Sequence, residues 1–260
     1  MGNDPARVAR GAPGNASRGR APRLGSCPTV TPSLNAIQTH TRVNDILLGP
    51  LERPALRWLA AHMPAWVSPD RLTVIGVLGA AIILLGYLLS AVNPGFLWLA
   101  SAGFVVNWFG DSLDGTLARF RHIEKPKYGF FVDHTTDAVG QVMIFLGLGL
   151  TPHVSFTVAS LALIAYLILS VLAYVRTCVA GEFKISYGRL GPTEIRVLAI
   201  LLNTAMYVFG VQTFTISFAS GASISVSPYD MVVSGIALLL LSFFITSGLR
   251  EARRLASLGE

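Results

Sequence analysis

Charged residues are scarce in this chain of 260 residues, at 13% of the total, whereas apolar residues make up 52%. An ordinary soluble domain carries about 25% charged residues, so the composition excludes that class. The apolar residues also gather in runs of about 20, the length that an α-helix needs to cross a bilayer. The sequence therefore predicts an all-α, polytopic membrane protein.

Cysteine is nearly absent as well. The two cysteines, Cys27 and Cys178, lie in different parts of the chain and have no metal-ligand spacing. This excludes a cysteine-ligated zinc site and a disulfide framework. Each is expected to be a small residue without a special role.

Large apolar residues are almost missing from residues 1–42, which combine Gly, Ala, Pro, Ser and Asn with several arginines. Such a segment is predicted to be a disordered cationic tail near anionic lipid. No apolar stretch of roughly 7–15 residues follows the arginines, which argues against a cleaved secretory signal. No folded reader of bases is visible, so nucleic acid is not an expected partner.

Six apolar runs are long enough to cross a bilayer. We predict spans near residues 70–90, 95–118, 129–150, 153–180, 194–219 and 229–249. The predicted organisation is a tail (1–42), an interfacial amphipathic helix (43–66), a six-span domain (67–252) and a cytoplasmic C-terminus (253–260). Residues 43–66 mix leucines with Glu52, Arg53 and Arg57, which is typical of a helix lying in the membrane surface. Ser68 and Pro69 suit the N-cap and first position of span one.

Lysine and arginine are absent from the loops between spans one and two, three and four, and five and six. All 20 of them lie in the tail, the interfacial helix, the first turn of span one, the loops 119–127 and 176–196, and the C-terminus. Positive residues mark the cytoplasmic side, so both termini are expected there. A composition rich in Ala and Arg points to a bacterial inner membrane.

Four aspartates lie where span two ends and span three begins. Small and acidic residues share one face of each helix: Asp111, Asp114, Gly115 and Ala118 on span two, and Gly129, Asp133 and Asp137 on span three. The short loop 120–128 pairs the two helices, so the four carboxylates converge. One carboxylate at bilayer depth costs about 3 kcal/mol even on mild scales. Four of them require cations, and oxygen-only ligands suit Mg²⁺ or Mn²⁺.

Acidic residues occur in membrane helices in two further settings. The first setting is an ordinary charge at the end of a helix. It explains a single aspartate well, but it does not explain why four aspartates share helix faces with small residues. An ion or proton transporter also places acids in its spans. Against it, Asp230 is the sole charged residue in the outer halves of the spans, and the two halves of the chain show no repeat. A divalent-ion transporter is therefore kept as a distant alternative.

The combined pattern is Asp111-x-x-Asp114-Gly115-x-x-Ala118-Arg119, nine residues, then Gly129-x-x-x-Asp133-x-x-x-Asp137. It resembles the signature of the CDP-alcohol phosphotransferases (CDP-alcohol phosphatidyltransferases), membrane enzymes of phospholipid synthesis. All eight signature residues are present, and the six spans with their interfacial helix are similar to the family core over roughly residues 44–250. The sequence departs from the family pattern in two places. The spacer before Gly129 has nine residues, where eight is commonest, and Asp70 stands where the family has Asn.

The resemblance implies metal-dependent transfer of a substituted phosphate group from a CDP-alcohol to an alcohol hydroxyl, with release of CMP. It implies two Mg²⁺ or Mn²⁺ ions held by the four aspartates, with Asp137 also serving as the catalytic general base. It implies a nucleotide site formed by Gly115, Ala118, Arg119 and Gly129. A homodimer among membrane lipids is implied as well.

The donor and acceptor stay open. The segments "DHTTD" (133–137) and "GPTE" (191–194) look like the choline and ethanolamine phosphotransferase branch, whereas the bacterial composition points to CDP-diacylglycerol. We expect CDP-diacylglycerol with a small polar alcohol, and keep CDP-choline or CDP-ethanolamine with diacylglycerol as the alternative. Three cytoplasmic cations are candidates for an acceptor phosphate, or are ordinary positive residues of that side: Lys127, Arg176 and Arg196. His134 either lies beside the metals or faces the helix pair.

Overall fold

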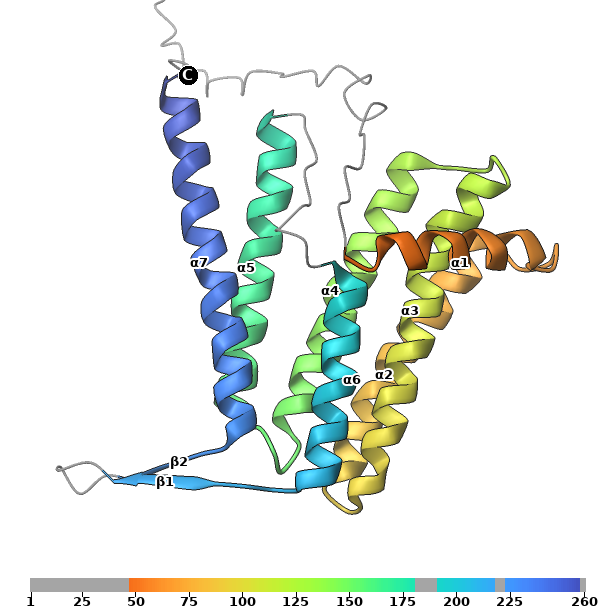
Figure 1. Ribbon diagram of the computed structural model, residues 1–260. Helices are drawn as coiled ribbons and strands as arrows, with labels where there is room; N and C mark the ends of the chain where they lie inside the picture. The colour runs from red at the N-terminus through yellow and green to blue at the C-terminus, as the bar shows by residue number, and fades with distance from the viewer. Residues whose placement is uncertain (1–46, 181–190, 218–222, 258–260) are drawn as a thin grey trace, which may run out of the picture. The chain divides into compact units, whose positions relative to one another are not determined.

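The computed structural model describes residues 47–180, 191–217 and 223–257, all within one unit that spans Asn35–Glu260. The predicted tail, residues 1–42, lies outside the described residues. Seven α-helices, one 3₁₀-helix and two strands make up the described chain (Figure 1): α1 (Gly49–His62), α2 (Pro69–Ser90), η1 (Pro94–Phe96), α3 (Leu97–Phe120), α4 (Pro126–Gly149), α5 (Phe156–Ala180), α6 (Pro192–Phe209), β1 (Phe214–Ser217), β2 (Ser223–Val226) and α7 (Pro228–Ser257).

Each of the six predicted apolar runs forms a helix, α2 to α7, and the helical class is confirmed. The predicted cap of the first run is also confirmed, because Ser68 Oγ accepts a hydrogen bond from Arg71 N at 3.3 Å. Residues 43–66 contain one helix, α1, whose bounds are narrower than predicted. The fold prediction is therefore right about the elements and approximate about their ends.

The prediction that the fifth run is helical to residue 219 is wrong. Helix α6 ends at Phe209, and Gly210 follows it with a positive φ of 67°, a conformation that glycine adopts without strain. The chain then forms an antiparallel pair of strands in which Phe214 lies opposite Val226. The sequence there alternates apolar residues with Thr and Ser, a strand pattern that a count of apolar residues does not separate from a helix.

Helix α1 runs crosswise to the longer helices in Figure 1 and is tied to α3 and α6 by polar contacts. Glu52 Oε1 accepts hydrogen bonds from Trp108 Nε1 at 2.9 Å and from Thr193 Oγ1 at 2.7 Å. Glu194, which is buried, accepts from Leu48 N at 2.8 Å. Leu56 and Ala60 on α1 are buried in one cluster with leucines of α3. These contacts fix α1 beside the end of α3.

Helices α2 and α3 approach closely because glycines line their contact. A Cβ placed on Gly110 would lie 2.6 Å from Gly76 Cα, and one placed on Gly79 would lie 2.7 Å from Asn107 Cα. Contacts that short do not occur between real atoms, so only glycine fits at this separation. At the same contact Asn107 Nδ2 donates to Gly76 O at 2.9 Å. Helix α4 packs on α2, and helices α1 and α6 pack on α3, so the pair lies at the centre of this group of helices.

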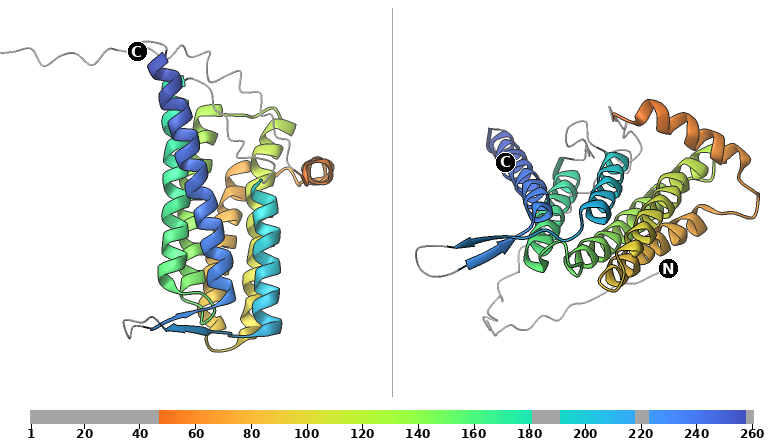
Figure 2. Two further views of the ribbon diagram at one scale, coloured as in Figure 1. Left: turned by 60° about the vertical axis from the view of Figure 1, so that its left-hand side comes forward. Right: turned by 60° about the horizontal axis from the view of Figure 1, so that its bottom comes forward.

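Helices α5 and α7 lie side by side in every view (Figures 1 and 2) and are joined at both ends. At one end Asp230, which is buried, accepts hydrogen bonds from Ser155 N at 2.7 Å and from Ser227 N at 2.9 Å. At the other end Arg176 Nη2 lies 3.1 Å from Glu251 Oε2. One carboxylate therefore secures the starts of both helices and another joins their far ends.

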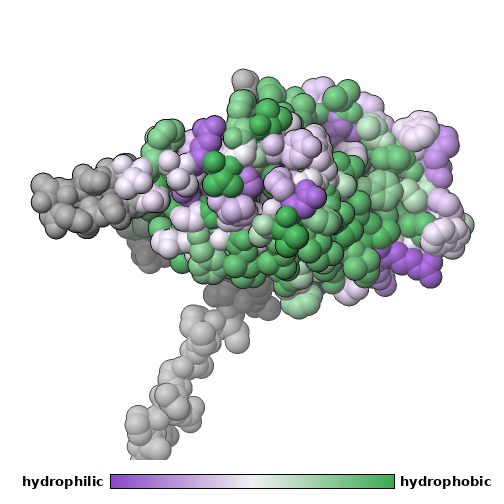
Figure 3. Space-filling view, turned by 90° about the horizontal axis from the view of Figure 1, so that it is seen from below, coloured by the Kyte–Doolittle hydropathy of each residue, from purple (hydrophilic) through white to green (hydrophobic). Residues whose placement is uncertain are grey.

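Three helices are long and apolar enough to cross a membrane: α2, α5 over Phe156–Val179, and α7. Many large apolar side chains are exposed, including Leu238 at 67% and Leu161 at 57%. Figure 3 shows apolar residues over much of the face seen from below. Continuous exposed apolar surface on a helical bundle is typical of contact with lipid.

The glycine contact predicts a large effect of one methyl group. Gly110→Ala forces α2 and α3 apart and is expected to cost about 1–3 kcal/mol, because overpacking a close contact strains the backbone. The measurement is thermal unfolding of the purified protein in detergent. Gly235→Ala is the matched control, since a Cβ there meets nothing within 4 Å. Equal unfolding midpoints for the two variants would show that the close approach of α2 and α3 does not depend on glycine.

Candidate active site

The four predicted aspartates come from the facing ends of α3 and α4. Asp111 and Asp137 line the same small cavity, and Asp133 offers a carboxylate oxygen within 4.8 Å of one on Asp137. Asp114 is within electrostatic reach of Asp111 and Asp133. The sequence prediction that the two helices bring these carboxylates together is therefore met by the geometry, although their roles stay a prediction.

Asp111 has a cationic partner from a third helix. Arg196 Nη2 on α6 donates to Asp111 Oδ2 at 2.5 Å, and Arg196 Nε donates to Asn107 Oδ1 at 2.9 Å. Arg196 is largely buried, with 12% of its side chain exposed, and Nη1 has no hydrogen-bond partner among the described residues. One positive charge thus offsets part of the negative charge of the cluster.

Asp114 is oriented by α2 and by its own helix. Thr73 Oγ1 donates to Asp114 Oδ2 at 2.7 Å, and Gly115 N donates to Asp114 Oδ1 at 2.5 Å. Two donors, one on each carboxylate oxygen, hold the group in a single orientation. The carboxylate is positioned before any ligand binds.

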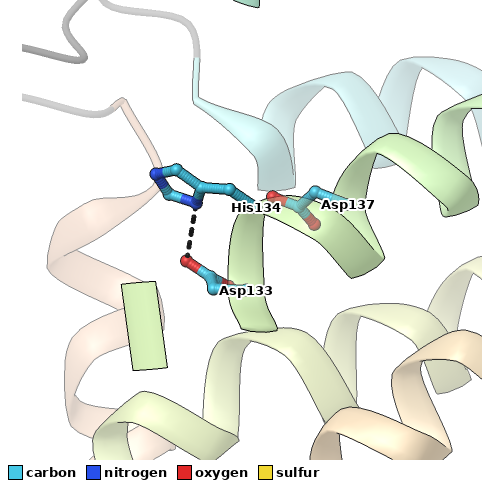
Figure 4. A group of neighbouring side chains, drawn as sticks. All are labelled: Asp133, His134 and Asp137. Carbon is cyan, nitrogen blue, oxygen red and sulfur yellow. Dashed lines mark ion pairs between the residues drawn. The ribbon is translucent and has the colours of Figure 1, made fainter. Parts of the chain in front are cut away.

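On α4, Asp133, His134 and Asp137 form a group whose ligand atoms all lie within 4.8 Å of one another. Figure 4 shows the three side chains and the contact of His134 Nδ1 with Asp133 Oδ2, at 3.3 Å. The imidazole also stacks on Tyr174 of α5, with ring centroids 5.3 Å apart. His134 thus lies beside Asp133 and stacks on α5, which is not one of the two helices that carry the aspartates, and a place beside bound metal stays a prediction.

A small cavity lies between the carboxylates of α3 and α4. Its volume is about 20 Å³, and its lining includes Thr73, Asn107, Asp111, Asp137, Gly140 and Arg196. A cavity of this size holds about one water molecule or one bare cation. Two of the four carboxylates, those of Asp111 and Asp137, line this cavity, and carboxylate oxygens are ligands suited to a hard divalent ion.

The sequence model of the CDP-alcohol phosphatidyltransferase family matches residues 66–243, which cover more than half of the chain and all four aspartates. The chain belongs to the CDP-alcohol phosphatidyltransferase family. Together with the three helices able to cross a membrane, this indicates an integral membrane protein.

Individual relatives are distant. Cholinephosphotransferase 1 from Danio rerio is 28% identical over 167 residues, which cover 60% of this chain and 42% of the relative. The Gallus gallus protein of the same name is 25% identical over 196 residues, or 70% of this chain and 56% of the relative. Phosphatidylinositol phosphate synthase from Cutibacterium acnes is 37% identical over 92 residues, or 35% of this chain and 41% of the relative. The chain spans about half the length of the curated relatives it matches.

The remaining residues of the family motif surround the carboxylates with little bulk. Gly129 is exposed, and a Cβ placed on it meets nothing within 4 Å. A Cβ on Gly115 would lie 3.4 Å from Arg119 Nη1, so the arginine folds back along α3. Arg119 Nη2 also donates to Thr116 Oγ1 at 3.3 Å, and Ala118 is partly buried. The facing ends of α3 and α4 therefore have room for a ligand.

The three cations predicted for an acceptor phosphate are in different surroundings. Arg196 pairs with Asp111, and Arg176 pairs with Glu251 on α7. Lys127 is exposed in the first turn of α4. Their role toward an acceptor stays a prediction, since two of the three already have carboxylate partners in this structure.

Sequence reasoning missed two residues that support the site, Thr73 and Asn107. Asn107 precedes Asp111 by four residues and so shares its helix face, a signal that the sequence contains. Thr73 is 41 residues from its partner Asp114. No local pattern reports that contact, because it depends on how closely α2 and α3 pack.

The Arg196–Asp111 pair predicts a stability effect in the absence of divalent ions. Arg196→Gln leaves Asp111 among other carboxylates without its cation, which is expected to cost of the order of 2 kcal/mol. Thermal unfolding in a buffer containing EDTA measures the loss. Lys127→Gln removes an exposed cation near the same end and serves as the control. Similar midpoints for both variants would show that Arg196 does not offset the carboxylates.

Proposed function

We propose that this protein transfers a substituted phosphate group from a CDP-alcohol to the hydroxyl of an acceptor alcohol and releases CMP, a reaction of phospholipid biosynthesis. Membership of the family and the complete eight-residue motif support the reaction class. The relatives named cholinephosphotransferase and phosphatidylinositol phosphate synthase are consistent with it.

The placement of Asp111 and Asp137 around one small cavity is the observation that carries the proposal. Two ionised carboxylates that face one small, partly buried cavity repel each other unless a cation or a shared proton lies between them. Arg196 offsets one charge, and the others call for bound metal. We therefore propose that Asp111, Asp114, Asp133 and Asp137 hold two divalent ions, Mg²⁺ or Mn²⁺.

When bound, the two ions neutralise the pyrophosphate of the donor and the charge that develops on the leaving CMP. The acceptor oxygen attacks the phosphorus that carries the alcohol substituent, and the bond from that phosphorus to the CMP oxygen breaks. Asp137 takes the proton of the attacking hydroxyl as general base. A carboxylate beside cations is a weak base, so orientation of the hydroxyl must supply much of the effect.

The chain's own residues then have distinct tasks. Thr73 and the Gly115 amide hold Asp114 in one orientation. We propose that Gly115, Ala118 and Gly129 leave room for the cytidine and that Arg119 donates to the donor phosphates. An arginine suits this task because its planar donors match two phosphate oxygens at once.

For the membrane arrangement, we propose that all six helices α2 to α7 span the bilayer with α1 in the cytoplasmic interface. Three of them lack the mean hydropathy of a span because they carry the aspartates, Glu194 or Arg196. Charges that face a site rather than lipid are tolerated in a span. The distribution of Lys and Arg supports a cytoplasmic site. The composition rich in Ala and Arg supports a bacterial inner membrane, and the family resemblance supports a homodimer.

Among donors we propose CDP-diacylglycerol, with a small polar alcohol as acceptor. Because Arg176 and Arg196 are paired with carboxylates, an acceptor without a phosphate is favoured. A second candidate, CDP-choline or CDP-ethanolamine with diacylglycerol, is favoured by the relatives named cholinephosphotransferase and by the "DHTTD" segment.

Replacing single aspartates tests the proposed chemistry. Asp111→Asn or Asp133→Asn is expected to lower CMP release by orders of magnitude while the protein still inserts, since the amide keeps the shape and loses the anionic ligand. EDTA should abolish activity of the unmodified protein. Glu124→Gln, an exposed acid in the loop between α3 and α4, should keep full activity. Undiminished turnover in either aspartate variant, or in EDTA, would refute the metal site.

A matrix of substrates identifies the pair. The donors are CDP-diacylglycerol, CDP-choline and CDP-ethanolamine, and the acceptors are inositol, serine, glycerol phosphate, inositol phosphate and diacylglycerol, with Mg²⁺ or Mn²⁺ present. We expect CDP-diacylglycerol with an unphosphorylated alcohol to release CMP. Release with CDP-choline or CDP-ethanolamine and diacylglycerol alone would establish the second candidate. No release from any pair would contradict the reaction class, and divalent-ion transport would be tested next.

A further inference from the structure

A second hollow lies beside the last turn of α3. Its volume is about 340 Å³, and the described residues that line it are Arg57 of α1 and Thr116, Arg119 and Phe120 of α3. It shares no lining residue with the cavity that contains Asp111 and Asp137. Its size is at the lower end of the range for small-molecule sites, about 300–1,000 Å³.

The surroundings of α1 place this hollow at the level of lipid headgroups. Large apolar side chains on and beside α1 are exposed, with Leu51 at 76%, Trp58 at 61% and Trp66 at 71%. Exposed Leu and Trp on a helix beside the membrane spans insert at the boundary of headgroups and acyl chains. Arg57 lies on a different face of α1 from Leu51 and Trp58, so its charge is held near the phosphates of the same leaflet.

The chemistry of the lining suits a phosphate attached to an apolar body. Arg57 and Arg119 bring two guanidinium groups to one hollow from two different helices. Guanidinium groups bind phosphate oxygens in pairs through their planar donors. Phe120 is about half exposed and gives the hollow an apolar wall against which glycerol and the first acyl carbons can pack.

We propose that the phosphate of an anionic phospholipid binds in this hollow, held by Arg57 on α1 and Arg119 on α3. This lipid is a bound neighbour of the enzyme and is separate from the donor that enters the carboxylate site. Its binding would link α1 to the end of α3, the helix that carries Asp111 and Asp114. Arg119 is also assigned to the donor phosphates above, so the lipid and the donor would compete for Arg119, and Arg57 is the residue that belongs to the lipid site alone.

The test measures the thermal unfolding midpoint of the full-length protein in neutral detergent while phosphatidylglycerol is added, with phosphatidylcholine as the uncharged comparison. Phosphatidylglycerol should raise the midpoint of the unmodified protein, because a ligand that binds the folded state stabilises it. Arg57→Gln should need about tenfold more phosphatidylglycerol for the same rise, the value of one charge-assisted contact. Arg53→Gln, on the same helix and also exposed, should behave like the unmodified protein.

Several outcomes would overturn the proposal. An unchanged lipid response in Arg57→Gln would do so, and so would an equal loss in Arg53→Gln, which indicates diffuse surface charge. An equal rise with glycerol phosphate or inorganic phosphate would assign the site to a free phosphate. A loss of CDP binding in Arg57→Gln with an intact lipid response would assign Arg57 to the donor.

If Arg57→Gln does not fold, Arg57→Lys is the second variant, because it keeps the charge without the planar fork of donors. Its response to phosphatidylglycerol should be weakened, and an unchanged response would overturn the proposal. CMP release is measured in a separate assay, so the lipid-binding result can be interpreted even if the proposed enzymatic reaction is not found.

Discussion

Repulsion among four carboxylates is the constraint on which the arrangement of α2, α3, α4 and α6 depends. Each neighbouring helix contributes a group that makes the cluster tolerable: Thr73 from α2 donates to Asp114, and Arg196 from α6 pairs with Asp111. These partners offset only part of the charge. The proposed divalent ions would offset the rest of the repulsion, and the stability gained on binding would appear as affinity for metal.

The glycine contact between α2 and α3 sets the distances on which the site relies. Because Gly76, Gly79 and Gly110 let the two backbones touch, the short side chain of Thr73 reaches Asp114 and Asn107 reaches the Gly76 carbonyl. If α2 and α3 lay further apart, longer side chains with more rotamers would be needed to reach the same acceptors. Because the backbones are close, short donors suffice, and they fix the orientation of the carboxylate that they bind.

Helical periodicity predicts which residues share a face, and that is sufficient for α2 to α7 and for the convergence of the aspartates. It does not predict which other helix that face meets. The Arg196–Asp111 pair joins residues 85 apart, so the sequence offers Arg196 as a ligand for an acceptor phosphate without revealing its neighbour. The strands β1 and β2 escape prediction for a different reason, since a short run of alternating apolar and polar residues satisfies a hydropathy window without satisfying a helix.

The two carboxylates that join α5 to α7 have a mechanical consequence. Asp230 fixes the starts of both helices and Glu251 ties their far ends, so the pair resists sliding and splaying along its whole length. Two helices coupled in this way move together as one rigid body. A movement of this pair away from the other helices would therefore displace α5 and α7 jointly, and it would separate His134 from Tyr174 at the contact with α4 and Tyr229 from Ala205 at the contact with α6.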